Sequence, residues 1–178
     1  MSLKEVEEIM EEMGTDAESI MDIIYNEVNK YSKELDKYVY NIQEKVDEGA
    51  KFTDEEIEEI VLRVPVYLYF AVEGLEKIGV DLDLAKGNKA EKSNTVYLNE
   101  GGTVEARKRA AELETFNEEI VASVYNRAYK LLNARIGKAE SIYAGFKKVF
   151  DKRIKEIDAS VLEKKYRDLS GSNHIDDK

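Results

Sequence analysis

The chain has 178 residues, of which 43% are apolar and 37% are charged. This length fits one domain with enough apolar residues to bury a core. The absence of cysteine excludes disulfides, zinc–thiolate sites and thiol nucleophiles, and the single histidine, His174, stands among polar residues near the C-terminus. One proline and ten glycines are too few for a loop-rich β protein, so we expect an all-α protein.

Neither a membrane span nor a secretory leader is predicted. No apolar run approaches the roughly 18 residues that a spanning helix needs. The first 13 residues carry five Glu and one Lys, which is unlike the basic and apolar pattern of a signal peptide. We therefore expect no membrane association and a cytoplasmic location.

The net charge of -11 hides an asymmetry along the chain. Residues 1–85 hold 8 basic and 23 acidic side chains, whereas residues 86–178 hold 19 and 15. The segment 127–155 is the most basic, with nine Lys or Arg against Glu140 and Asp151. Such polarity suggests an interaction surface on the C-terminal half, although solubility and ion pairs between subunits would explain these charges equally well.

Two helices are predicted in the first 48 residues. Residues 3–13 form a short helix that ends at Gly14, which makes 1–14 a separate N-terminal element. Thr15 and Glu18 then form a capping box that opens a helix over 15–48. The apolar residues of this second helix recur every three or four positions, close to the repeat of a packed helical seam.

A second capping box, Thr53 with Glu56, opens a helix over 54–78 that ends near Gly79. Pro65 predicts a kink or break near residues 63–65, because a mid-helix proline removes a backbone hydrogen bond. The apolar stretch 64–72 is the predicted centre of the core. The acidic run 54–59 fits the helix dipole and requires no metal.

The remaining chain is predicted as an irregular stretch followed by one long helix. Residues 81–102 form a loop or a frayed helix over about 82–98, and Thr103 starts a helix over 103–168 that only Gly137 and Gly145 interrupt. At about 1.5 Å per residue this helix exceeds a compact monomer, so it either breaks or belongs to an oligomer. We favour an oligomer and leave open whether the helix bends at one of these glycines. Residues 169–178 have the composition of a disordered tail.

The expected fold is thus one all-helical domain over 15–168, built as a helical bundle or coiled-coil-like hairpins with a very long C-terminal helix in an oligomer. No phosphate-cradling glycine motif, nucleophile–base pair or metal-ligand cluster is recognisable, so we expect neither enzymatic activity nor a cofactor.

Two basic clusters are the candidate binding residues, and one of them includes an aromatic side chain. Cations for phosphates and a ring for base stacking are what single-stranded nucleic acid requires. The first cluster consists of Lys86, Lys89, Lys92, Tyr97, Arg107, Lys108 and Arg109. The second cluster forms one broad face of the last helix and consists of Arg127, Lys130, Arg135, Lys138, Lys148 and Lys152.

The order of these parts resembles the UvsY-type recombination mediators of tailed phages. The resemblance rests on the segments LAKGNKAEKSNTVYLNEGG and VYNRAYKLLNARIGKAESIYAGFKKVFDKRI and covers roughly residues 25–155. Members have a Lys/Arg- and Tyr-containing segment, a Gly-rich connection and a long C-terminal helix. The spacing of the basic segment is looser here, and residues 1–85 are more acidic than in the family.

The resemblance implies a single-stranded DNA-binding protein in the host cytoplasm of a phage. It places the family's basic and aromatic DNA segment on Lys86, Lys89, Lys92 and Tyr97. It further implies a ring-like homo-oligomer assembled through the C-terminal helices. Such an oligomer helps a RecA-like recombinase to displace the single-strand-binding protein.

Two other functions remain open. The chain could be an all-helical phage assembly, virion or host-factor-binding protein in which the charges only solvate and pair. It could also be an acidic DNA mimic that uses Glu55, Glu56, Glu58 and Glu59 as phosphate surrogates, although a helix N-terminus explains these carboxylates more simply.

Overall fold

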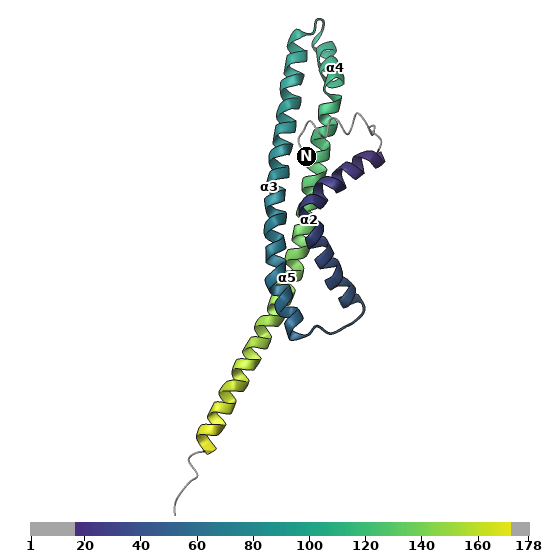
Figure 1. Cartoon of the computed structure of the whole chain (residues 1–178). Helices are drawn as coiled ribbons and strands as arrows, with labels where there is room; N and C mark the ends of the chain where they lie inside the picture. Colours follow the sequence, from purple (N-terminus) through teal and green to yellow (C-terminus); the bar gives the residue numbers. More distant parts are fainter. Residues whose placement is uncertain (1–16, 172–178) are drawn as a thin grey trace, which may run out of the picture.

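The computed structural model describes residues 17–171, which fold into four helices. These are α2 (Ala17–Asp47), α3 (Asp54–Asn99), α4 (Val104–Glu114) and α5 (Phe116–Gly171). Helix α3 runs antiparallel to α4 and α5 in a long hairpin, and α2 packs against one side of it (Figure 1). The predicted all-α class is confirmed, since the described residues contain no strand.

Some predicted elements fall outside the described residues. These are the helix over 3–13, Gly14 and Thr15 of the first capping box, His174, and residues 172–178 of the tail. The described part of helix α2 runs from Ala17 to Asp47, and the predicted start at residue 15 lies outside the described residues. The tail prediction was wrong for residues 169–171, because α5 continues to Gly171.

Helix α2 changes direction near its middle (Figure 1), where a buried serine perturbs its backbone. The Ser32 hydroxyl lies 3.2 Å from the carbonyl oxygen of Val28, one turn earlier, and 2.8 Å from the carboxylate of Asp36. Hydrogen bonds from a serine to the preceding turn bend helices. The bend lets both halves of α2 place apolar residues against the hairpin, from Ile23 in the first half to Ile42 in the second.

Helix α3 begins as predicted, with a complete capping box. The Thr53 hydroxyl accepts the Glu56 backbone N–H at 3.2 Å, and the Glu56 carboxylate accepts the Thr53 N–H at 2.8 Å. Each side chain therefore satisfies a backbone donor that has no partner within the helix.

The predicted interruptions of α3 were wrong. The helix passes through Pro65 and Gly79 without a break, so the predicted helices over 54–78 and 82–98 are one element. Val64 before the proline and Ala71 after it, and Ile78 and Leu82 around the glycine, are all buried. Tertiary packing on both sides of each position holds the backbone helical despite the local propensity.

The predicted helix over 103–168 is divided at Thr115, which separates α4 from α5. Thr103 caps α4 as expected, with its hydroxyl 3.3 Å from the Ala106 nitrogen. Thr115 is buried, and its hydroxyl donates to the carbonyl oxygen of Ala111 at 2.7 Å. Helix α5 then runs unbroken through Gly137 and Gly145, and its 56 residues correspond to about 84 Å.

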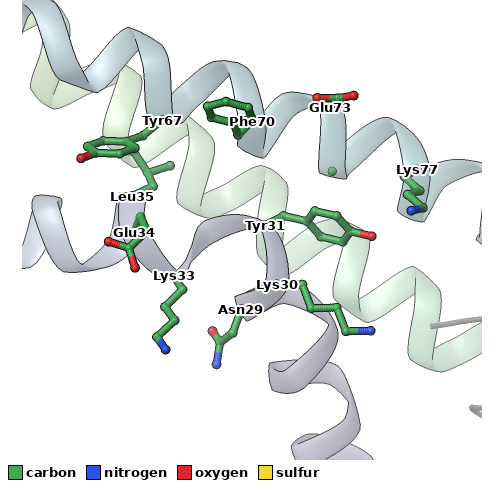
Figure 2. A pocket seen from close by; sticks show the side chains of 11 residues that line it. Asn29, Lys30, Tyr31, Lys33, Glu34, Leu35, Tyr67, Phe70, Glu73 and Lys77 are labelled. Atoms are coloured by element: carbon green, nitrogen blue, oxygen red, sulfur yellow. The ribbon is translucent and has the colours of Figure 1, made fainter.

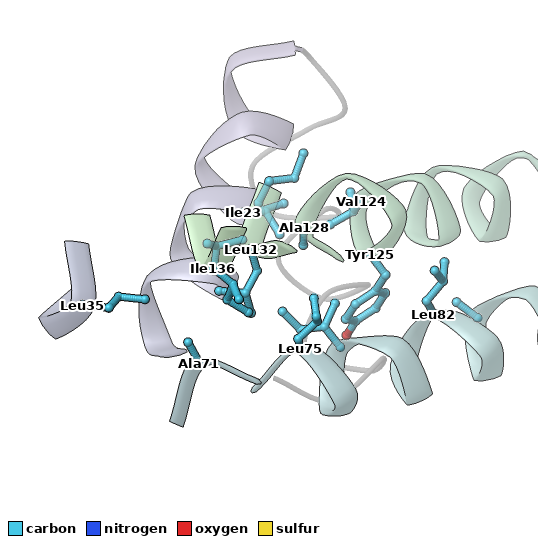
Figure 3. Close-up of a cluster of buried hydrophobic side chains, with 14 of the residues drawn as sticks. Ile23, Leu35, Ala71, Leu75, Leu82, Val124, Tyr125, Ala128, Leu132 and Ile136 are labelled. Atoms are coloured by element: carbon cyan, nitrogen blue, oxygen red, sulfur yellow. The ribbon is translucent and has the colours of Figure 1, made fainter. Parts of the chain in front are cut away.

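The core lies where α2, α3 and α5 meet (Figure 3). Tyr125 and Leu132 of α5 are fully buried there, together with Ala71 and Ile78 of α3. The prediction that residues 64–72 form the centre of the core was only partly right. Val64 and Ala71 are buried, but four other members of that stretch are exposed: Val66, Tyr69, Phe70 and Val72.

Candidate nucleic-acid interface

The side of α5 away from the core carries a row of cations. At about 100° per residue, a strip about 80° wide on this side holds no carboxylate between Arg127 and Lys155, and Glu140 and Asp151 lie beside it. The neutral residues within the strip are small: Ala134, Gly137, Ser141 and Gly145. We call its exposed cations the α5 ridge: Arg127, Lys130, Lys148, Lys152 and Lys155. The ridge is about 42 Å long.

Most of the α5 ridge is not neutralised by neighbouring carboxylates. Within the described part of the chain, four of its cations form no ion pair, and Lys152 lies 3.7 Å from Glu156 in the following turn. The Lys152 and Glu156 side chains are 79% and 65% exposed, and exposed pairs of this kind contribute little. Among the described residues, most of the positive charge of the ridge therefore stays unpaired.

Two predicted site residues of α5 instead attach this helix to α2. The Arg135 guanidinium lies 2.8 Å from both Asn29 Oδ1 and Ser32 Oγ and forms an ion pair with Asp36. Lys138 donates to Gln43 Oε1 at 2.9 Å. Both side chains turn toward α2, so they hold the fold together and are separate from the α5 ridge.

The first basic cluster is divided in the same way. Lys89 and Lys92 of α3 form ion pairs with Glu119 and Glu118 at the start of α5, at 3.3 and 2.5 Å. Lys86 lies 3.9 Å from Asp83 in its own helix. These three lysines have carboxylate neighbours, and two of them close the hairpin between α3 and α5.

The rest of the first cluster lies at the end of the hairpin where α3 turns into α4. Tyr97 is half-buried near the end of α3, and Arg107 is half-buried on α4. Lys108 and Arg109 are exposed on α4. Tyr97, Arg107, Lys108 and Arg109 therefore lie on the two helices that meet at this end, whereas the α5 ridge begins at Arg127, eleven residues into α5.

Sequence analysis missed a groove between α2 and α3 (Figure 2). It has a volume of about 630 Å³ and is lined by the aromatic rings of Tyr31, Tyr67 and Phe70. Lysine and glutamate side chains surround these rings. Ser32, beside Tyr31 of this groove, hydrogen-bonds to the preceding turn and is a local signal in the sequence for the bend of α2.

Neither a metal site nor a membrane span is found in residues 17–171. No group of three or more His, Asp or Glu side chains there could hold a metal ion. No helix in that range is long and apolar enough to cross a bilayer.

Comparisons with known protein families, with curated proteins and with solved structures found no match to this chain.

Proposed function

We propose that the protein is a non-enzymatic, single-stranded DNA-binding accessory protein of recombination that works as a homo-oligomer. The observation that supports this proposal is the α5 ridge, which spans about 42 Å with no carboxylate in its strip. Its cations form two groups, Arg127 with Lys130 and Lys148 with Lys152 and Lys155, about 27 Å apart. A surface of this kind attracts the phosphates of a nucleic acid and releases their counterions.

The composition of the α5 ridge favours binding without sequence preference. The neutral residues between its cations are small and carry no aromatic ring. The contacts are therefore made to the phosphate backbone rather than to base edges. A flexible single strand adapts to an irregular row of cations along a straight helix more readily than a rigid duplex does.

One ridge with five cations binds weakly, so assembly is part of the proposal. Several copies that present the ridge side by side convert later contacts into intramolecular ones and raise the overall affinity. The resemblance to UvsY-type mediators supports single-stranded DNA over other polyanions. It also supports a RecA-like recombinase and a single-strand-binding protein as partners in a phage-infected cytoplasm.

Fluorescence anisotropy with a labelled oligonucleotide tests this proposal. The double variant Arg127→Glu/Lys130→Glu is expected to bind at least tenfold more weakly at low salt. The slope of log K against log salt should become shallower by about 0.7 for every phosphate that the variant no longer neutralises. The matched control Lys37→Glu/Lys51→Glu reverses two exposed lysines that are not part of α5 and leaves binding within twofold. Absence of binding by the assembled wild-type protein at low salt would refute the proposal.

The second candidate is a helical assembly protein that does not bind nucleic acid, which the exposed apolar residues of α3 and α5 favour. Light scattering on the same double variant separates the two candidates. Weaker DNA binding at unchanged mass supports the recombination protein. A lower mass with no effect on DNA binding supports the assembly protein.

A further inference from the structure

Three large apolar side chains are exposed in a row on α3. Leu62, Val66 and Tyr69 are 64%, 53% and 68% exposed, and their spacing of four and three residues places them on one face. The ring of Phe70, also exposed, lies beside Tyr69 with 5.6 Å between centroids. We call Leu62, Val66 and Tyr69 the α3 patch, and a contiguous apolar face of this kind marks an interaction site.

Carboxylates lie at both ends of the α3 patch on the same face of the helix. Glu55 and Glu58 precede it, and Glu73 and Glu76 follow it. All four are exposed and form no ion pair with described residues. From Glu58 to Glu73 this face is about 23 Å long.

The far end of α5 has the opposite arrangement. Phe150, Ile154, Ile157 and Val161 follow one face at spacings of four, three and four residues, and we call them the distal stripe. Ile154, Ile157 and Val161 are 42%, 57% and 45% exposed. Lys147 precedes the distal stripe, and Lys164 and Lys165 follow it. From Lys147 to Lys164 the face is about 26 Å long.

The distal stripe cannot reach the α3 patch of its own chain. Arg153 of α5 forms an ion pair with Asp54, the first residue of α3, so α5 passes the end of α3 at this point. Residues 154–171 continue for about 27 Å beyond it. In Figure 1 this part of α5 extends away from the rest of the molecule.

We propose that the distal stripe of one copy docks on the α3 patch of a second copy. The two faces are similar in length, and each has apolar residues at its centre. The carboxylates at the ends of the α3 patch and the lysines at the ends of the distal stripe have opposite charges, which selects the partner face and its alignment. Pairing of two distal stripes would instead bring like-charged lysines together and leave the α3 patch uncovered. This inference rests on the homo-oligomer of the proposed function and gives it a head-to-tail contact, which closes into a ring or extends into a filament.

Charge reversal on each face tests the contact. The first variant is Glu58→Lys/Glu76→Lys on α3, and the second is Lys147→Glu/Lys165→Glu on α5. In each variant alone, the ends of the α3 patch and of the distal stripe meet with like charges. The association constant measured by sedimentation velocity is therefore expected to fall at least tenfold. An equimolar mixture of the two restores assembly, because each α5 then meets a complementary α3. The control Glu112→Lys/Glu114→Lys reverses two exposed carboxylates of α4 and leaves the mass unchanged.

Far-ultraviolet circular dichroism establishes that both variants are folded. An unchanged mass for the α3 variant, or a mixture that fails to assemble, would overturn the head-to-tail contact. DNA binding is measured separately on the wild-type protein. If the charge reversals weaken assembly but the wild-type oligomer binds no oligonucleotide, the proposed function is refuted and the head-to-tail contact stands. If the wild-type protein binds DNA but both variants keep the wild-type mass, the head-to-tail contact is refuted and the proposed function stands.

Discussion

The ring of Tyr31 fills the space beside Gly74. A Cβ atom at position 74 would lie only 2.2 Å from Cγ of Tyr31, so no larger residue fits without movement of α2. Tyr31 directly precedes Ser32, where α2 bends, and Gly74 lies in the interior of α3. This contact therefore fixes the position at which the bent helix crosses the hairpin (Figure 2).

Substitution of Gly74 by alanine is expected to destabilise the protein. Alanine improves helix propensity by up to about 1 kcal/mol. The clash with the Tyr31 ring costs about 1–3 kcal/mol, so the free energy of unfolding should fall by up to about 2 kcal/mol. Urea denaturation measures this change.

Gly87→Ala is the matched control in the same helix, because no atom lies within 4 Å of a Cβ at that position. It is expected to raise the free energy of unfolding by up to about 1 kcal/mol. Equal effects of the two substitutions would contradict the packing of Tyr31 against Gly74.

The contact between Arg135 and Asp36 is expected to stabilise the fold and to contribute little to DNA binding. A double-mutant cycle with Arg135→Ala and Asp36→Ala should give a coupling energy of about 0.5–1.5 kcal/mol in urea denaturation. Affinity for an oligonucleotide should change less for Arg135→Ala than for Arg127→Ala. Additive effects on stability, within about 0.3 kcal/mol, would show that the pair is not coupled.

Asp81 is expected to make stability depend on pH. Burial raises the pKa of Asp81 above its ordinary value of 3.8, and the nearby Glu27 carboxylate raises it further, against the opposing effects of Lys77 and Lys30. A raised pKa means that the folded state holds the proton more tightly than the unfolded state. The free energy of unfolding therefore falls as pH rises through the interval between the two pKa values.

Asp81→Asn removes this dependence because the amide stays neutral. The variant should be more stable than the wild type at pH 7, and the difference should shrink as pH falls toward about 4, the ordinary range of an aspartate pKa. Urea denaturation at several pH values measures it. A difference that is constant with pH would contradict the assignment.

Local rules predicted the helix starts well. The Thr53 box and the Thr103 cap could be recognised because each involves residues within one turn, and the structure contains both. The same rules failed at Pro65 and Gly79, where contacts with α2 and α5 outweigh the local preference for a break. Thr115 was missed because its burial is seen only in the folded structure.

For the basic residues too, some features follow from the sequence and others only from the packing of the helices. Composition and periodicity were enough to predict a helical chain, cations in its C-terminal half, and a basic face on the last helix. The packing of the helices sets which charges are paired: Arg135, Lys89 and Lys92 form ion pairs within the fold, whereas Arg127 and Lys130 stay exposed. Helical periodicity is a property of neighbours along the chain, whereas the partner of a charge depends on which helix packs beside it.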